Sequence, residues 1–225
     1  MESLLTDPLI LSITSYVKTY MQNYDPSHDF DHIQRVLSLS YHLYSHSPNN
    51  QSPPLDLKTI HLCALLHDVG DRKYLLPSQD PTTLITSVLL QYGCDPSLAQ
   101  KVQTICLAVS YSTEVKSPHH VLSVLAQHPE LAIVQDADRL DALGAVGLAR
   151  MFTFGGAKRT RSLQASVDHI EDKLVKLEGM MKTEEGKRLA GERTRRLRVF
   201  QREWAEEVGF VERVGLVGRE KEEGE

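Results

Sequence analysis

The 225 residues predict an all-α protein built as a helical bundle. Apolar residues recur every three or four positions along most of the chain, as expected for helices with one buried face. Several of these stretches begin with aspartate followed by proline, a pair that caps a helix and fits its first turn. No segment alternates apolar and polar residues for long enough to predict a strand.

The first three helices follow from this pattern. Asp7-Pro8 predicts a helix from Pro8 to about Asn23, and a second helix begins near Asp31 and ends before the polar loop HSPNNQSPP. The third, about 55–69, is apolar almost all round, which is typical of a helix in the middle of a bundle. Gly70 ends it.

The rest of the chain is also predicted to be helical. Asp80-Pro81 and Asp95-Pro96 should open helices that run to about Tyr92 and Val109. The segment TFGGAKRTRS has paired glycines and clustered basic residues, which predicts a mobile loop. The remaining helices are expected at about 118–127, 129–138, 142–151, 162–181 and 184–208.

Length and composition predict one domain over residues 1–212 and a disordered tail over 213–225. The 41% hydrophobic and 24% charged content is ordinary for a globular protein, and no run approaches the roughly 20 apolar residues of a membrane helix. We expect no membrane partner and a cytoplasmic protein, with a nuclear location left open. A net charge of −5 argues against nucleic-acid binding, and the three cysteines lack metal-site spacing and are expected to be buried thiols.

The pair His67-Asp68 at the end of an apolar helix is the most informative feature of the sequence. His32, near the start of an earlier helix, and Asp138, near the end of a later one, supply a second imidazole and a second carboxylate. A bundle lets three helices converge, so the four side chains predict one divalent cation at the centre of the bundle.

Two nitrogens and two carboxylates leave open positions in an octahedral shell, which suits catalysis better than structure. This donor set admits Mn²⁺, Fe²⁺, Co²⁺, Ni²⁺ or Mg²⁺. A histidine-aspartate pair alone is weak evidence, since His28-Asp29 also occurs in this chain. The order histidine, histidine-aspartate, aspartate at helix ends is much stronger.

The sequence resembles the HD-domain metal-dependent phosphohydrolases, and within them a YedJ/YpgQ-like branch. The resemblance covers about residues 20–210 and is carried by four segments: HDFDHIQRV, ALLHDVGDRK, VQDADRLDALGAVGLARMFTFGG and KLVKLEGMMKTEEGKRLAGERT. It implies an all-α HD fold with an HD core at about 20–150 and C-terminal helices at about 160–210.

The resemblance also implies a ligand set. His32, His67, Asp68 and Asp138 match the four metal-ligand positions, and Asp138 is preferred to Asp136 and Asp141 because the family ligand directly precedes the basic residue and leucine at 139–140. We expect one divalent ion, with Mn²⁺ as the first choice. Related nucleotidases carry an acidic residue three positions after the aspartate of the pair, where this chain has the shorter Asp71.

Hydrolysis of a phosphate ester or anhydride follows from such a site. Asp71 is the candidate for proton transfer, although a loop carboxylate or a helix cap is nearly as good an interpretation. Arg72 and Lys73 are candidates to bind phosphate oxygens, or else solvated surface charges. Arg35 either reaches the substrate or pairs with a carboxylate such as Asp31 or Asp138.

Two further groups of residues have weaker signals. Lys158 and Arg159, with Arg161, follow Gly155-Gly156 in a predicted loop that could close over a polyphosphate. His28 and Asp29 either orient His32 or cap its helix, and capping suits Asp29 better.

The sequence therefore predicts a metal-dependent phosphohydrolase acting on a small nucleotide, as a nucleoside triphosphate pyrophosphohydrolase or a nucleotidase. One alternative is a di-iron oxygenase of the HD type, but its second ion needs extra histidines between Asp68 and Asp138. That interval holds only His119, His120 and His128. The other alternative is a nucleotide-binding module without turnover.

Overall fold

The computed structural model describes residues 2–48, 54–71, 74–77, 79–158 and 161–213, and within these ranges every regular element is a helix. The prediction of an all-α bundle is confirmed. The α-helices are α1 Glu2–Leu5, α2 Pro8–Tyr20, α3 Phe30–Ser45, α4 Leu57–Leu66, α5 Leu84–Gln91, α6 Pro96–Val109, α7 Tyr111–Lys116, α8 Pro118–Gln127, α9 Glu130–Asp141, α10 Gly144–Lys158, α11 Leu163–His169 and α12 Glu184–Arg213.

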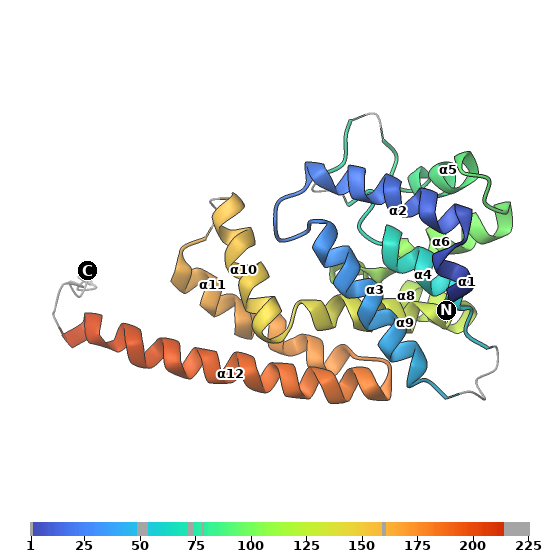
Figure 1. The fold of residues 1–225 in the computed structure, drawn as a ribbon. Coiled ribbons are helices and arrows are strands. Elements are labelled where there is room, and N and C mark those ends of the chain that lie inside the picture. The colour runs from blue at the N-terminus through green and yellow to red at the C-terminus, as the bar shows by residue number, and fades with distance from the viewer. Residues whose placement is uncertain (1, 49–53, 72–73, 78, 159–160, 214–225) are drawn as a thin grey trace, which may run out of the picture.

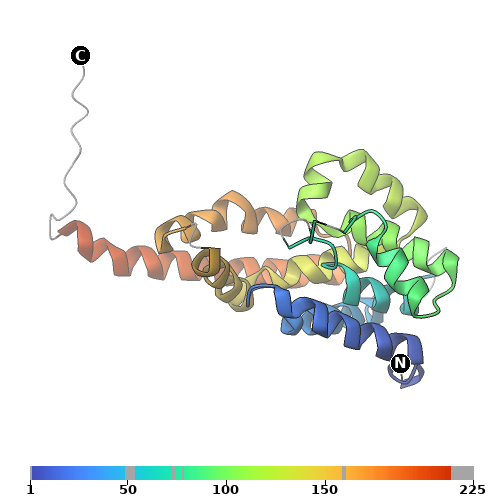
Figure 2. The same ribbon diagram turned by 90° about the horizontal axis from the view of Figure 1, so that it is seen from above.

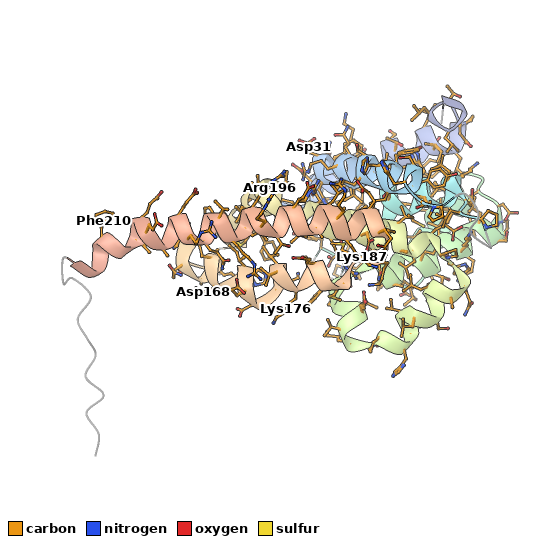
Figure 3. The ribbon with its side chains drawn as sticks, turned by 90° about the horizontal axis from the view of Figure 1, so that it is seen from below. Asp31, Asp168, Lys176, Lys187, Arg196 and Phe210 are labelled. Atoms are coloured by element: carbon orange, nitrogen blue, oxygen red, sulfur yellow. The ribbon has the colours of Figure 1, made fainter. Side chains whose placement is uncertain are left out.

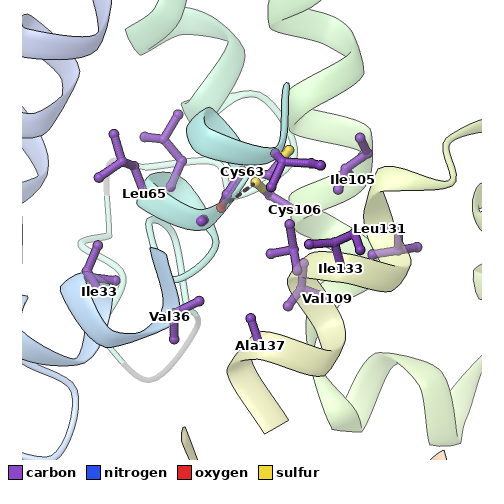
Figure 4. Close-up of a cluster of buried hydrophobic side chains, with 14 of the residues drawn as sticks. Ile33, Val36, Cys63, Leu65, Ile105, Cys106, Val109, Leu131, Ile133 and Ala137 are labelled. Atoms are coloured by element: carbon purple, nitrogen blue, oxygen red, sulfur yellow. Dashed lines mark hydrogen bonds between the residues drawn. The ribbon is translucent and has the colours of Figure 1, made fainter. Parts of the chain in front are cut away.

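The helices that carry the predicted site are α3, α4 and α9, and they lie side by side at the centre of the bundle (Figure 1). α4 is buried all round, as its apolar sequence predicts, and it is capped by Asp56. The close-up in Figure 4 shows its Cys63 and Leu65 packed among Ile33 of α3, Ile105 of α6 and Ile133 of α9. The ends of these helices are therefore held by a close-packed core.

Aspartate caps set several helix starts. Asp7 accepts the backbone N–H of Leu9 at 2.9 Å, and Asp95 caps α6 in the same way, so α2 and α6 begin at the predicted prolines. Asp80-Pro81 behaves differently, and the prediction of a helix from this pair was wrong by three residues. Asp80 Oδ1 accepts the N–H and the hydroxyl of Thr82, which stabilises a turn, and α5 begins only at Leu84.

The prediction of a loop at Gly155-Gly156 was also wrong. α10 runs through both glycines to Lys158. A Cβ at Gly155 would lie 3.0 Å from Ser166 Oγ of α11, so this glycine permits a close approach of two helices. The sequence also missed the short helices α1 and α7, and it ended the helix containing Asp138 one turn too early.

The C-terminal part is one long helix with shorter ones packed on it. α11 continues as a π-helical turn, Ile170–Leu174, and a 3₁₀ turn, Val175–Met180, which lie along α12. α12 begins beside α9, and it extends away from the other helices in Figure 2. Figure 3 shows Lys187 at the bundle end of α12 and Phe210 at the far end. The predicted tail at 213–225 lies outside the described residues except for Arg213, the last residue of α12.

The prediction for the cysteines holds within the described residues. Cys63, Cys94 and Cys106 are buried and unpaired thiols, and Cys106 lies against the carbonyl of Cys63. None of the helices described here is both long and apolar enough to cross a membrane.

Candidate metal centre

The structure brings His32, His67, Asp68 and Asp138 together at one point. His32 Nε2 lies 3.2 Å from His67 Nε2, 3.3 Å from Asp68 Oδ2 and 3.6 Å from Asp138 Oδ1. His67 Nε2 lies 3.6 Å from Asp68 Oδ2 and 3.8 Å from Asp138 Oδ1. Four potential ligand atoms from three helices therefore surround one small volume.

Local structure fixes each of these side chains. His32 is in the first turn of α3, whose cap Asp29 accepts the His32 N–H at 3.1 Å. His67 is the C-cap of α4, and Asp68 lies in the turn that follows, which ends at Gly70 with a φ of 88°. The phenol of Tyr24 donates to the Asp68 carbonyl at 2.7 Å. The two imidazoles are buried, whereas the side chains of Asp68 and Asp138 keep 16% and 26% exposure, so the centre opens toward solvent on its carboxylate side.

The two imidazoles present their unprotonated nitrogens to each other. His32 Nδ1 bonds Asp141 Oδ2 at 2.8 Å, and His67 Nδ1 bonds the carbonyl of Ala64 at 2.9 Å. Both partners are acceptors, so both Nδ1 atoms carry the proton and both Nε2 atoms carry a lone pair in the neutral rings. Two lone pairs 3.2 Å apart and flanked by carboxylates repel one another unless a proton or a metal cation lies between them.

Asp68 gives a second reason to expect positive charge at this point. Its Oδ2 is buried and has no hydrogen-bond partner. Burial alone would raise the pKa of this carboxyl, but the positive charge that His67 and His32 carry when protonated lowers it well below its ordinary value. An ionised oxygen that is buried and unbonded is the donor a divalent cation takes. The residues present therefore fit a divalent metal ion.

Asp141 holds His32 in position, a role that the sequence did not reveal. Besides His32 Nδ1, its carboxylate binds Arg35 at 2.8 and 3.1 Å and Arg150 at 3.2 Å. Burial would raise the pKa of Asp141, but the bonds from His32 and Arg35 keep it well below its ordinary value. A buried carboxylate on the far nitrogen of a metal-ligating histidine fixes its ring and tautomer.

The three aspartates near the end of α9 have different partners. Asp136 accepts the backbone N–H groups of Lys182 and Thr183 at 2.7 to 3.0 Å, which ties α9 to the residues just before α12. Asp141 binds His32, and Asp138 faces the common point. Of the three, only Asp138 has its carboxylate beside the Nε2 atoms of both His32 and His67.

The other predicted site residues are distributed as follows. Asp71 lies in the turn after Gly70 and donates its N–H to the Asp68 carbonyl at 3.1 Å. Its charge contributes to the raised pKa of Tyr24 and Tyr74, behind the larger effect of burial. The predicted phosphate-binding residues Arg72, Lys73 and Arg159 and the side chain of Lys158 lie outside the described residues.

The two residues proposed to orient His32 do so less directly than Asp141. Asp29 caps α3, as its spacing suggested. The ring of His28 lies edge-on to that of His32, with centroids 5.9 Å apart, and its Nδ1 is within 2.7 Å of the Ser27 hydroxyl. Ser27 also donates its N–H to Asp25 at 3.0 Å, which links His28 to the loop before α3.

Among the described residues, no further histidines group with this centre to bind a second ion. His119 and His120 are exposed on α8, and among the described residues only His32, His67 and Asp68, joined by the nearby Asp138, group at this centre. Arg35 uses its guanidinium on Asp141, so of the sequence alternatives the pairing with a carboxylate is the one observed.

Comparison with known proteins gives a family match over the part of the chain that contains the four candidate ligands. The HD domain family model matches residues 29–143. The chain is 30% identical over 203 residues to YpgQ of Bacillus subtilis, covering 89% of this chain and 94% of YpgQ. A crystal structure of YpgQ in complex with ADP has a TM-score of 0.63 and 29% identity, with 88% of this chain and 96% of that chain covered. An HD-superfamily hydrolase from Bacillus thuringiensis is also similar, with a TM-score of 0.58, 28% identity and coverage of 89% and 96%.

Proposed function

Because the chain belongs to the HD domain family, whose members bind divalent metals, we propose that it is a metal-dependent phosphohydrolase acting on a small nucleotide. The reaction would be that of a nucleoside triphosphate pyrophosphohydrolase or of a nucleotidase. The observation that carries the proposal is the convergence of four side chains: His32 Nε2 and His67 Nε2 lie 3.2 Å apart, and Asp68 Oδ2 and Asp138 Oδ1 each lie 3.3 to 3.8 Å from both nitrogens.

These four residues would hold one divalent cation, with Mn²⁺ as the first choice and Mg²⁺, Co²⁺, Ni²⁺ and Fe²⁺ as alternatives. A bound divalent cation supplies positive charge that polarises a phosphoryl oxygen and makes water a better nucleophile at neutral pH. The exposed edges of Asp68 and Asp138 leave the solvent side of the centre accessible to substrate.

Other residues of the chain would orient the metal ligands and transfer protons. Asp141 keeps the lone pair of His32 on Nε2, with Arg35 and Arg150 neutralising its charge. Asp71, in the turn beside the centre, is proposed to accept a proton from the attacking water or return one to the leaving group. Arg35, held by Asp141, is assigned to positioning, so the phosphate-binding role is left to Arg72, Lys73, Lys158 and Arg159.

Nucleotide as the substrate class is supported by the relative whose crystal structure contains ADP. That relative covers most of both chains at 29% identity. The similarity to HD-superfamily hydrolases supports hydrolysis over binding without turnover.

A release assay tests the proposal. The protein is freed of metal, loaded with Mn²⁺, Mg²⁺, Co²⁺, Ni²⁺ or Fe²⁺, and assayed for phosphate and pyrophosphate release from nucleoside mono-, di- and triphosphates. We expect metal-dependent release from at least one nucleotide and its loss in Asp68→Ala, with Asp31→Asn, an exposed aspartate on the same helix as His32, as the matched control.

Two outcomes would overturn the proposal. Nucleotide binding with no release under any metal would favour the binding module. Two irons per chain with oxygen consumption would favour the oxygenase.

A further inference from the structure

A second group of metal-binding side chains lies at the other end of α3. His42 and His46 are four residues apart in its last turn and C-cap, and Glu185 is in the first turn of α12. Two histidines at this spacing lie on one face of a helix and can bind the same ion. Within the described residues, this is the one group of three besides His32, His67 and Asp68 whose ligand atoms all lie within 4.8 Å of one another.

The contacts already join the two helices. His42 Nε2 donates a hydrogen bond to Glu185 Oε1 at 2.8 Å, where a metal would take the place of the proton, and the ring centroids of His42 and His46 are 4.3 Å apart. The side chain of Glu185 is only 13% exposed, whereas that of His42 is 42% exposed. A cation here would therefore bind at the surface, against a carboxylate that is held in place.

The hydrogen bonds of His46 prepare its other nitrogen for a metal. Its Nδ1 lies 2.8 Å from the carbonyl of His42, so Nδ1 is the protonated nitrogen and Nε2 carries the lone pair. A backbone carbonyl on the far nitrogen is a common support for a metal-ligating histidine. The hydroxyl of Ser45 donates to the same carbonyl at 2.7 Å, which holds the last turn of α3 in shape.

One cation competes for the carboxylate. Arg188 lies one turn along α12 and binds both oxygens of Glu185, at 2.7 and 2.8 Å. It also binds Glu192 at 2.6 Å. Arg188 is 55% exposed, so its guanidinium can keep Glu192 and one Glu185 oxygen when the other binds a metal.

We propose that His42, His46 and Glu185 form a second, separate site for a divalent transition-metal cation of the zinc class. Two imidazoles and one carboxylate are a donor set that suits Zn²⁺ and leaves its fourth position open. His46 and Glu185 also line a cavity of about 370 Å³, floored by apolar side chains such as Leu43 and Leu125. An ion held by His46 and Glu185 would therefore lie beside a space that admits water or a small ligand.

This site is distinct from the predicted catalytic centre. His32 and His42 are ten residues apart on α3, which is about 15 Å along a helix. The two groups share no ligand, so each can be removed without the other. The second site would fasten the end of α3 to the start of α12.

Zinc binding to defined variants tests the inference. Wild-type protein, His46→Ala, His119→Ala and Asp68→Ala are freed of metal and titrated with Zn²⁺ by calorimetry. His119 is an exposed histidine on α8 and serves as the matched control. We expect His46→Ala to lose one zinc equivalent, or to weaken it by at least the roughly 10- to 100-fold that loss of an outer hydrogen-bond partner costs. His119→Ala and Asp68→Ala should keep this site.

A spectroscopic measurement separates binding from folding. Co²⁺ bound by two imidazoles and a carboxylate should add visible absorption bands to those of the predicted centre, and these added bands should be absent from His46→Ala and Glu185→Gln while the helical circular dichroism is unchanged. Equal zinc stoichiometry and affinity in His46→Ala and His119→Ala would overturn the inference. If Asp68→Ala loses no ion while His46→Ala loses one, the proposed function fails and this site stands.

Discussion

Asp141 shows how much of the centre depends on a residue that would touch neither metal nor substrate. It is buried, bonded to His32 and paired with two arginines. These contacts keep the carboxylate ionised and the imidazole in one tautomer. A neutral side chain of the same size would keep the shape of the site but would no longer hold the imidazole of His32 in one tautomer.

For Asp141→Asn we therefore expect weaker metal binding, by about 10- to 100-fold, because the amide can donate to Nδ1 and favour the wrong tautomer. Mn²⁺ titration of the metal-free protein measures the affinity. Asp31→Asn, on the exposed first turn of α3, should bind Mn²⁺ like the wild type. Equal affinities for all three proteins would show that Asp141 does not set the state of His32.

His61 predicts a specific dependence of stability on pH. It is buried on α4, accepts a hydrogen bond from the Tyr41 hydroxyl at Nδ1, and burial lowers its pKa to about 4 from an ordinary 6.5. Below pH 6.5 the unfolded chain binds a proton that the folded one does not. The free energy of unfolding should therefore fall by about 3 kcal/mol from this group as pH drops from 6.5 to 4.

Urea unfolding at several pH values measures this effect. The free energy of unfolding is plotted against pH for each protein. The difference in slope between wild type and His61→Gln isolates the contribution of His61, and His120→Gln on the surface should leave the slope unchanged. Parallel pH profiles for wild type and His61→Gln would contradict the assignment.

The sequence could predict the candidate ligands but not their supporting partners. His32, His67, Asp68 and Asp138 are recognisable because each lies at or near the end of an apolar helix, where a polar side chain has no reason to be buried alone. Asp141 is 109 positions from His32, and nothing local to either residue reports their contact. From the sequence, Asp141 is only a rival to Asp138 as a ligand.

At the scale of the element, helix starts were predictable where the cap had no competitor. Asp95 caps α6 directly, whereas Asp80 is used by Thr82 in a turn, so the same two-letter signal gives different starts. Paired glycines have the same ambiguity. They predict a loop from sequence alone, and only the neighbouring helix shows why Gly155 is inside α10.

The two glycines of α10 give a paired prediction. At Gly156 nothing lies within 4 Å of the methyl group that alanine would add, so Gly156→Ala should raise the free energy of unfolding by about 0.5–1 kcal/mol, as in any helix interior. At Gly155 the methyl would lie 3.0 Å from Ser166 Oγ, which is bonded to Ser162, so Gly155→Ala should gain less or destabilise. Thermal unfolding of both variants measures the contrast. A loop at this position would make the two substitutions equivalent.

At the scale of the whole molecule, the proposed cation would join three segments that are far apart in the sequence. α3, the end of α4 and α9 each supply donors, so metal binding should stabilise the bundle as a unit. At a Mn²⁺ concentration 100 times the dissociation constant, the gain is about 2.7 kcal/mol. For a chain of this size that is a rise in Tm of about 5–10 °C.

Calorimetry with Mn²⁺ and then with excess chelator checks the expectation. The fall in Tm on chelation should be much smaller in Asp68→Ala, which lacks one proposed ligand. An equal fall in both proteins would place the stabilising ion elsewhere.

The C-terminal half of α9 limits how the length of this chain can change. Asp136, Asp138 and Asp141 each meet a different partner, and successive residues of a helix point about 100° apart. Inserting or deleting one residue just before Asp136 would turn all three carboxylates together and disconnect α12, the predicted cation and His32 in a single step. Insertions and deletions among relatives should therefore be absent from this helix and should occur instead in loops that do not contact it.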